Sequence, residues 1–254
     1  GMVGKWHQGP RVTKFPKDLD WASTGGQAAA RKQYARDIAA IKHCGFEYAD
    51  GVYSGNPLGF MPGKQAVHNT EWVTQAALTF LDKAGGRPFF LYVATTLTHD
   101  PNGVGSGLQS DPRITPAGYL DTACASQPSR QSVLDRTRSA GVSNHVMMNV
   151  TWLDDAVGAV LEKLKAMGVV DNTLVIVASD NGKRGKFSCY DAGARMPMLA
   201  YWPGRVKRGS VCKKLTSNVD FAPTLYELAG CTPTDERAFD GTSLVPLLTG
   251  KGGY

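Results

Sequence analysis

Three short, unbroken apolar runs constrain the fold of this chain more than any other feature of its sequence. They span residues 88–94, 173–178 and 198–202 and are rich in aromatic and β-branched side chains. Unbroken runs, unlike alternating ones, are typical of strands covered on both faces, as in parallel α/β sheets. We therefore expect each run to form a buried strand.

Helical patterns separate these runs. Apolar residues recur at intervals of three or four positions over residues 28–43, 70–84, 144–167 and 220–228. Strands that alternate with helices predict a layered α/β domain, with a mostly parallel central sheet and helices on both faces. A chain of 254 residues is long enough for one such domain, which we place over residues 1–254.

Composition and charge exclude several classes of protein. No apolar run approaches the ~20 residues that cross a bilayer, so the sequence predicts no membrane span. The formal net charge of +6 fits either a solvated basic face or the attraction of anionic substrates. Nucleic-acid binding has no supporting motif. The five cysteines include no CxxC pair and no zinc-ligand spacing, and they leave both disulfides and the redox compartment open.

Asp180, Asn181 and Gly182 follow closely on the second apolar run. In open α/β sheets, ligands bind beyond the carboxyl ends of the strands. A carboxylate beside an amide oxygen offers two hard oxygen ligands, which suit Ca²⁺ or Mg²⁺ rather than zinc. An Asn-Gly turn after a strand is also common. The motif by itself leaves both interpretations open.

Three other short segments carry residues suited to the chemistry of anions. Lys5 and His7 combine a cation with a titratable imidazole. His99 comes shortly after the first apolar run and is a candidate general acid for a leaving group. Lys186 lies beside glycine, which lets the backbone bend so that the ammonium faces an oxyanion. Taken singly, each residue is also compatible with an exposed side chain in a loop.

The order of these segments along the chain is more specific than any one of them. The ordered motifs are Gly4-Lys5-Trp6-His7, Pro88-Phe89-Phe90-Leu91-Tyr92, His99-x-Pro101, Leu153-Asp154-Asp155-x-Val157-Gly158, Asp171-Asn172-Thr173-Leu174-Val175-Ile176, Ser179-Asp180-Asn181-Gly182, Gly185-Lys186, Trp202-Pro203-Gly204, Asp220-x-Ala222-Pro223-Thr224-Leu225 and Asp240-Gly241-x-Ser243-Leu244. Together they strongly resemble the sulfatase family of the alkaline-phosphatase-like superfamily, and most of all the arylsulfatases. The resemblance covers nearly the whole chain.

The resemblance implies a hydrolase that cleaves sulfate esters to an alcohol and sulfate. It implies that Asp180 and Asn181 are two ligands of a single Ca²⁺, for which Mg²⁺ is the alternative. It also implies a formylglycine nucleophile, made from Cys or Ser in a Cys/Ser-x-Pro-Ser-Arg motif. Such a nucleophile divides a difficult displacement into two easier steps.

Four further residues match catalytic positions of the family. Lys5 resembles the lysine that bridges the sulfate and the nucleophile, and Lys186 resembles the second sulfate-binding lysine. His7 resembles the histidine that hydrogen-bonds the nucleophile, and His99 resembles the one that protonates the leaving alcohol. The resemblance thus implies catalytic roles for all four residues and contacts to the substrate from Lys5, His99 and Lys186.

The chain departs from the family pattern at its start. In the family, the nucleophile motif and a pair of calcium-binding aspartates lie upstream of the Gly-Lys-x-His motif, at which this chain begins. Residues 126–130 fit the nucleophile spelling but lie downstream, and we interpret them as a chance match with an ordinary Arg130, a permuted chain being the alternative. We therefore expect a fragment that lacks the nucleophile strand and a C-terminal subdomain, and that is inactive alone.

Two other functions stay open at this point. One is hydrolysis of phosphate or phosphonate esters, which the same superfamily performs at a similar site. The other is non-catalytic binding of sulfated glycans through basic loops. We expect a sulfated small molecule or glycan as the partner, with its organic part bound by the glycine- and proline-rich loops over residues 54–66 and 100–130. By resemblance, we expect export to the periplasm or the cell exterior, with a signal peptide that is not part of this chain.

Overall fold

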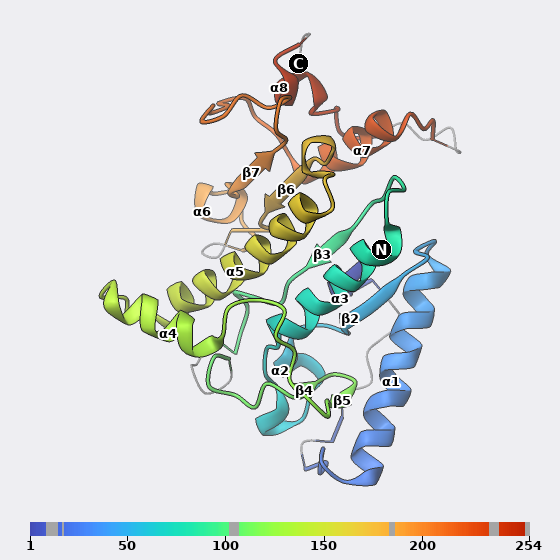
Figure 1. The fold of residues 1–254 in the computed structure, drawn as a ribbon, viewed down its shortest axis with the longest axis vertical. Helices are drawn as coiled ribbons and strands as arrows, with labels where there is room; N and C mark the ends of the chain where they lie inside the picture. Colours follow the sequence, from blue (N-terminus) through green and yellow to red (C-terminus); the bar gives the residue numbers. More distant parts are fainter. Residues whose placement is uncertain (9–14, 17, 102–106, 183–185, 234–238, 252–254) are drawn as a thin grey trace. The chain divides into compact units, whose positions relative to one another are not determined.

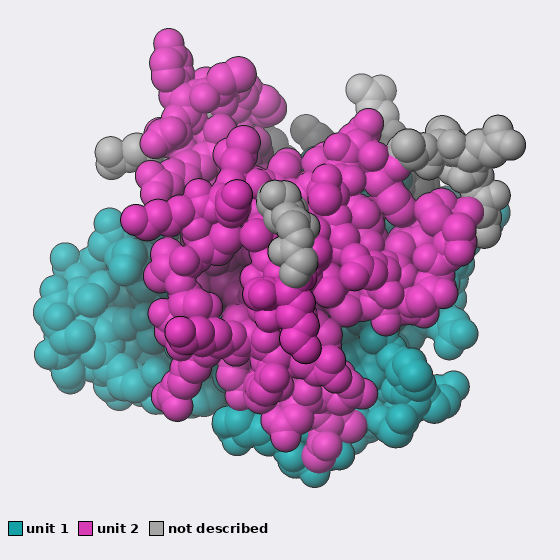
Figure 2. All heavy atoms as spheres, turned by 90° about the horizontal axis from the view of Figure 1, so that it is seen from above, with its two compact units in different colours: residues 1–167 teal, residues 168–254 magenta. Residues whose placement is uncertain are grey.

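The structure is a computed structural model, and it describes residues 1–8, 15–16, 18–101, 107–182, 186–233 and 239–251. The chain divides into two compact units, Gly1–Met167 and Gly168–Tyr254, which Figure 2 shows in different colours. The prediction of one domain over residues 1–254 stays a prediction.

Unit 1 is built around a three-stranded parallel sheet. Its strands are β1 (Met2–Lys5), β2 (Ala49–Tyr53) and β3 (Tyr92–Ala94), in the spatial order β2-β1-β3. Figure 1 labels β2 and β3. Parallel strands need long crossover connections. Helix α1 (Thr24–His43) lies in the first crossover and α3 (Thr70–Ala84) in the second. Because β2 and β3 lie on opposite sides of β1, the topological switch point of the sheet lies between β1 and β3.

Different helices cover the two faces of this sheet. Met2 of β1 and Val52 of β2 lie in one apolar cluster with Ile41 of α1. Val3 of β1 lies in a second cluster with Ala77 of α3, as expected for neighbouring strand residues that point to opposite faces. These five side chains are 0% exposed. The predicted α/β class, with a parallel sheet and helices on both faces, is confirmed in this unit.

Unit 1 contains several further elements. They are α2 (Pro57–Phe60), η1 (Gly63–Gln65), β4 (Ile114–Thr115), β5 (Gly118–Tyr119), α4 (Arg130–Ser139) and α5 (His145–Ala166). Strands β4 and β5 form a short antiparallel pair. Helix α5 packs against both α3 and α4, and its Trp152 is fully buried.

Unit 2 is built around an antiparallel pair of strands. Its elements are η3 (Val170–Asn172), β6 (Val175–Ala178), α6 (Asp191–Ala194), β7 (Met198–Tyr201), η4 (Asn218–Asp220), α7 (Phe221–Ala229) and α8 (Val245–Thr249). β6 and β7 pair with Ala178 opposite Met198. Helix α7 ends at Gly230, whose φ of 63° is the left-handed conformation that glycine readily adopts.

The predicted helices are confirmed, whereas the predicted strands are more exposed to solvent than expected. Helices α1, α3, α5 and α7 occupy the four helical patterns of the sequence. The expectation of strands covered on both faces over residues 173–178 and 198–202 is wrong: β6 and β7 are antiparallel, and Leu199 is 71% exposed. Tyr92 of β3 is also 47% exposed. An apolar run shows that a segment suits a strand, but the pairing partner and the covering surface are set by distant parts of the chain.

Two further observations concern membranes and cysteines. None of the helices in the described part of the chain is long and apolar enough to cross a membrane. All five cysteines lie among the described residues and are free thiols: Cys44, Cys124, Cys189, Cys212 and Cys231.

Candidate functional site

The carboxyl ends of β1 and β3 bring two of the predicted catalytic segments together. The two strands are parallel neighbours with Gly4 opposite Ala94. Lys5 and His7 therefore leave the sheet at the same edge as the turn that carries His99. Ligands of open α/β sheets bind at this edge, next to the switch point. The structure thus brings Lys5, His7 and His99 to one edge of unit 1, which we call the switch-point edge.

Lys5 is positioned by an irregularity of β1 that requires glycine. Gly4 has a φ of +90°, and a Cβ there would lie 2.0 Å from the carbonyl oxygen of Ala94. The pairing of β1 with β2 shifts register between Val3 and Gly4. The half-buried Lys5 then donates from Nζ to Oδ1 of Asn56 at 3.4 Å. Because this partner is a neutral amide, the contact does not neutralise the ammonium, and its charge stays available for an anion.

His7 lies close to the end of β2. The preceding Trp6 donates its N–H to the carbonyl of Tyr53 at 2.8 Å. The His7 ring also lies beside Gly55, shortly after β2: a Cβ added to that glycine would be 3.9 Å from Cδ2 of His7. The imidazole is exposed. An exposed imidazole at the carboxyl edge of the sheet is suited to exchange a proton with a bound reactant.

His99 lies in a turn after β3 whose backbone is held from both sides. The His99 N–H donates to the carbonyl of Thr96 at 3.0 Å. The His99 carbonyl accepts a hydrogen bond from Nε2 of His68 at 3.1 Å. The imidazole of His99 is exposed. The backbone is therefore anchored, while the ring is free to meet a substrate.

Sequence reasoning misses two residues of the switch-point edge, Asn56 and His68. His68 is fully buried directly before α3. Burial lowers its pKa to about 4, against the opposing effect of hydrogen bonds to backbone carbonyls. The sequence does indicate that His68 lies next to the start of a helix, because the following residue, Asn69, is a good N-cap residue before an apolar periodic run. Asn56 is defined by its contact with Lys5, which no local pattern reveals.

In unit 2, Asp180 and Asn181 form the turn that follows β6, as the sequence predicts. Gly182 allows this turn because a Cβ there would lie 2.1 Å from the carbonyl oxygen of Ala192. The Gly182 N–H also donates to the carbonyl of Gly193 at 2.9 Å. Asp180 is exposed and Asn181 is half-buried. The close packing of α6 against Gly182 therefore fixes the backbone from which the side chains of Asp180 and Asn181 extend.

The side chains of this turn fit a hard cation. Within the described residues, the hydrogen bonds to Asp180 and Asn181 end on their backbone carbonyls, from Asn218 and Ser179 respectively, and leave both side chains uncommitted. Calcium takes six to eight oxygen ligands. No group of three or more His, Cys, Asp or Glu side chains suited to a metal occurs among the described residues. Asp180 and Asn181 therefore fit part of a coordination shell.

Lys186 lies in unit 2 on an exposed stretch. Its Nζ lies 5.5 Å from the centre of the Phe187 ring, which is 99% exposed. Gly185, the other half of the predicted motif, lies outside the described residues. The prediction that the residues of unit 1 and unit 2 meet in one site stays a prediction.

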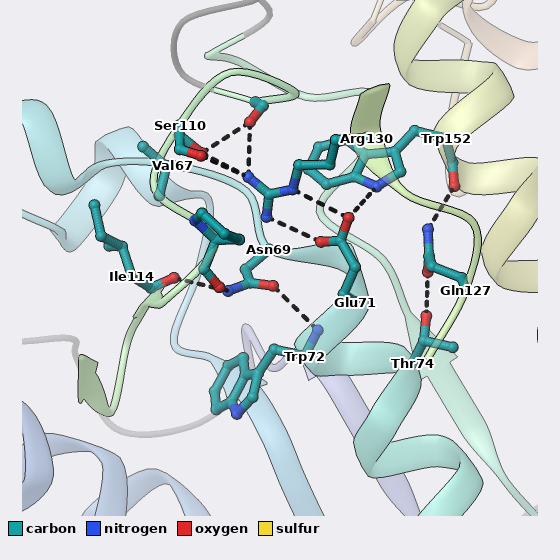
Figure 3. A network of polar contacts seen from close by, with 12 residues as sticks. Val67, Asn69, Glu71, Trp72, Thr74, Ser110, Ile114, Gln127, Arg130 and Trp152 are labelled. Atoms are coloured by element: carbon teal, nitrogen blue, oxygen red, sulfur yellow. Dashed lines mark hydrogen bonds and ion pairs between the residues drawn. The ribbon is translucent and has the colours of Figure 1, made fainter. Parts of the chain in front are cut away.

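The segment that fits the nucleophile spelling, residues 126–130, makes structural contacts. Ser126 donates from Oγ to the carbonyl of Glu71 at 2.7 Å, and Ser129 caps helix α4. Arg130 forms an ion pair with Glu71, with Nη2 2.9 Å from Oε2 (Figure 3). Its side chain is only 10% exposed. The expectation of an ordinary Arg130, one without a catalytic role, stays a prediction. These contacts account for the segment without a nucleophile.

Known proteins resemble this chain along most of its length. The family model described as Sulfatase matches residues 1–231. Human N-acetylgalactosamine-6-sulfatase is 32% identical over 268 residues, which covers 97% of this chain and 45% of that protein. Human arylsulfatase A is 33% identical over 181 residues, which covers 65% of this chain and 30% of that protein. The chain thus spans less than half the length of these curated relatives.

Solved structures show the same fold. The structure of Ps i-CgsB in complex with k-i-k-neocarrahexaose has a TM-score of 0.58 at 24% identity, covering 96% of this chain and 53% of that chain. The PsFucS1 sulfatase from Pseudoalteromonas sp. has a TM-score of 0.58 at 20% identity, covering 98% of this chain and 51% of that chain. At this level of identity, the likeness shows a shared fold.

Proposed function

This chain belongs to the sulfatase family, and from that premise we propose that the complete protein hydrolyses sulfate esters to an alcohol and sulfate. One observation carries the proposal: Lys5, His7 and His99 gather at the switch-point edge of a chain that matches the Sulfatase model over residues 1–231. A cation and two exposed imidazoles at one edge of a sheet can supply charge stabilisation and proton transfer, which the hydrolysis of an anionic ester needs.

Each of the proposed catalytic residues has a distinct part in this reaction. His99 donates a proton to the alcohol oxygen as the bond between sulfur and that oxygen breaks. Lys5 and Lys186 stabilise the negative charge on the sulfate oxygens. His7 would hydrogen-bond the nucleophile and assist its turnover. The neutral contact of Lys5 with Asn56 supports this assignment, because it orients the ammonium without neutralising it.

Asp180 and Asn181 would hold part of a Ca²⁺ site, with Mg²⁺ as the alternative. Their uncommitted oxygen atoms support this assignment. We place the formylglycine nucleophile in a segment upstream of residue 1. When bound, the cation and the formylglycine supply Lewis-acid stabilisation and covalent catalysis.

We propose a sulfated small molecule or glycan as the substrate. The similarity to an N-acetylgalactosamine-6-sulfatase along 97% of the chain supports a sulfated sugar. The loops over residues 54–66 and 100–130 stay our candidates for its organic part. Export to the periplasm or the cell exterior also stays a prediction.

The test compares two esters with the same leaving group. The complete protein is assayed with 4-nitrophenyl sulfate and with 4-nitrophenyl phosphate, and we expect faster cleavage of the sulfate. Lys186→Ala lowers kcat/KM for the sulfate by about a hundredfold or more, because it removes a charge that stabilises the transition state. His99→Asn causes a comparable loss with phenyl sulfate, whose poorer leaving group depends more on the general acid. Lys207→Ala, a change at another exposed lysine of unit 2, is the matched control and leaves the rate unchanged.

Two outcomes contradict the proposal. Faster cleavage of the phosphate ester assigns the protein to the hydrolysis of phosphate esters. Binding of a sulfated glycan without turnover, in a complete protein whose intact mass shows no formylglycine, assigns it to glycan binding. Residues 1–254 alone are expected to show no turnover.

A further inference from the structure

His68 is the buried member of the five histidines of this chain. It is 0% exposed, whereas His7, His43, His99 and His145 are exposed. It lies directly before helix α3, and its ring reaches the turn after β3. Its Nε2 lies 3.1 Å from the carbonyl oxygen of His99 and 3.1 Å from that of Pro101.

The partners of the ring define its tautomer. Both neighbours of Nε2 are carbonyl oxygens, which only accept hydrogen bonds, so Nε2 carries the proton and shares it between them. Nδ1 lies 2.7 Å from Oγ1 of Thr96. In the neutral ring, Nδ1 accepts the proton of that hydroxyl. Burial lowers the pKa of His68 to about 4, which keeps the ring neutral at pH 7.

The element that carries His68 is itself firmly anchored. The carbonyl of Val67 accepts a hydrogen bond from the hydroxyl of Tyr53 at 3.3 Å. Asn69 caps α3 and donates from Nδ2 to the carbonyl of Ile114 at 3.0 Å (Figure 3). His68 therefore lies between two fixed residues, and its ring reaches His99 from a rigid support.

Among the described residues, the imidazole of His99 has no comparable support of its own. Its Nδ1 lies 3.5 Å from the carbonyl of Asp100, a marginal contact. The position of the ring therefore follows from the backbone of the turn. That backbone is fixed by Thr96, which accepts the His99 N–H, and by His68, which donates to the His99 carbonyl.

We propose that His68 is a positioning residue for proton transfer, which holds His99 in place through the hydrogen bond from its Nε2–H to the His99 carbonyl. The inference rests on the proposed role of His99 as the general acid. A general acid must lie within hydrogen-bond reach of the leaving oxygen, and a misplacement of about 1 Å costs roughly a hundredfold in rate. Because both neighbours of Nε2 are carbonyl oxygens, a side chain that replaces His68 must place a hydrogen-bond donor at this position to keep the contact with His99.

Two substitutions separate the contacts of His68. In His68→Asn, the short amide retains a polar group near Nδ1, beside Thr96, but does not reach the carbonyl of His99. In His68→Gln, the longer side chain places an N–H donor near the position of Nε2. His145→Asn makes the same chemical change at an exposed histidine and is the control.

The complete protein and these variants are assayed with phenyl sulfate and 4-nitrophenyl sulfate. Phenol is the poorer leaving group, so cleavage of phenyl sulfate depends more on the general acid. We expect His68→Asn to lower kcat for phenyl sulfate by about tenfold to a hundredfold, with a much smaller loss for 4-nitrophenyl sulfate and little change in KM. We expect His68→Gln to recover most of the loss and His145→Asn to match the unchanged protein.

Labelling reports the contact independently of activity. His99-Asp100 is the only His-Asp pair in the 254 residues. Protein labelled with carbonyl-¹³C histidine and ¹⁵N aspartate therefore gives one amide–carbonyl NMR correlation from this pair. We expect the ¹³C shift of the His99 carbonyl to move in His68→Asn and to return toward its original value in His68→Gln.

The inference and the proposed function fail in different ways. If the unchanged protein cleaves neither ester, the proposed function fails, and the carbonyl shift alone then decides whether His68 holds the turn. If the protein is active but His68→Asn lowers both rates by the same factor, His68 contributes to folding and the positioning role is overturned. An unchanged ratio of the two rates together with an unchanged carbonyl shift overturns it as well.

Discussion

The guanidinium of Arg130 and the carboxylate of Glu71 form a bidentate ion pair inside unit 1. Nε lies 3.0 Å from Oε1 and Nη2 lies 2.9 Å from Oε2, and the side chains are 10% and 6% exposed. Trp152 donates from Nε1 to the same carboxylate at 2.9 Å (Figure 3). The remaining Arg130 nitrogen, Nη1, donates to the carbonyls of Gly107 and Ser110. The pair thus joins α3, α4 and α5 to the loop between β3 and β4.

Breaking this pair is expected to destabilise unit 1 strongly. Arg130→Met leaves the carboxylate of Glu71 buried without its cation, and we expect the free energy of unfolding to fall by about 3–5 kcal/mol. Arg113→Met breaks the exposed ion pair with Asp111, in which Arg113 is 51% exposed, and costs at most about 1 kcal/mol. Urea unfolding followed by circular dichroism measures both. Equal losses would contradict the structural role of the buried pair.

His68 is expected to make stability depend on pH. Its pKa is about 4 in the folded protein, below the ordinary value of 6.5. Between these values the unfolded chain binds a proton that the folded protein does not, so stability falls as the pH falls. We expect this residue to lower the free energy of unfolding by about 2 kcal/mol from pH 7 to pH 5. Urea unfolding at both pH values measures the change, and in His68→Gln this contribution disappears. An equal pH dependence in the two proteins contradicts the prediction.

Gly182 is expected to be required for the turn that carries Asp180. Its substitution by alanine places Cβ 2.1 Å from the carbonyl oxygen of Ala192, so the backbone must shift. We expect Gly182→Ala to cost about 1–3 kcal/mol. Gly158, inside helix α5, has open space around it, and Gly158→Ala is expected to stabilise by about 0.5–1 kcal/mol. Thermal unfolding should thus shift in opposite directions for the two variants; a shared direction contradicts the prediction.

Asp180 is expected to contribute to calcium binding by the complete protein. Calcium at about a hundredfold excess over Kd stabilises a protein by about 2.7 kcal/mol, so a chelator should lower the melting temperature. Asp180→Asn removes a charged ligand and weakens calcium binding by about tenfold or more. Asp171→Asn, at an exposed aspartate of η3, is the control. Titration calorimetry gives both affinities, and calcium affinity unchanged by Asp180→Asn would remove Asp180 from the metal site.

Ser126 is expected to have no catalytic role. Its hydroxyl donates to the carbonyl of Glu71, so Ser126→Ala costs about 1 kcal/mol of stability and leaves the specific activity of the complete protein unchanged. Intact-mass analysis should show an unmodified serine at this position. Loss of all activity in Ser126→Ala would instead indicate the permuted arrangement, in which residues 126–130 supply the nucleophile.

The accuracy of the sequence-based prediction differs between helices and strands for a physical reason. Helix α3 is found at residues 70–84 as predicted, because its apolar face repeats within the segment itself. Strands β1 and β2 carry no apolar run that could be recognised: β2 contains Asp50 and Gly51. Their burial comes from pairing with each other and from α1 and α3, which lie far away in the sequence.

The sequence by itself determined the family and named candidates for the site. Ordered motifs identify a sulfatase, and local patterns place Asp180 and Asn181 after a strand, because turns and strand ends depend on neighbouring residues. Tertiary structure alone decided that Lys5 and His99 share one edge, since this depends on the strand order β2-β1-β3. It also decided that His68 contacts the His99 carbonyl and that Arg130 is buried against Glu71. Contacts between residues about 30 to 60 positions apart follow from how the elements pack, which no local pattern encodes.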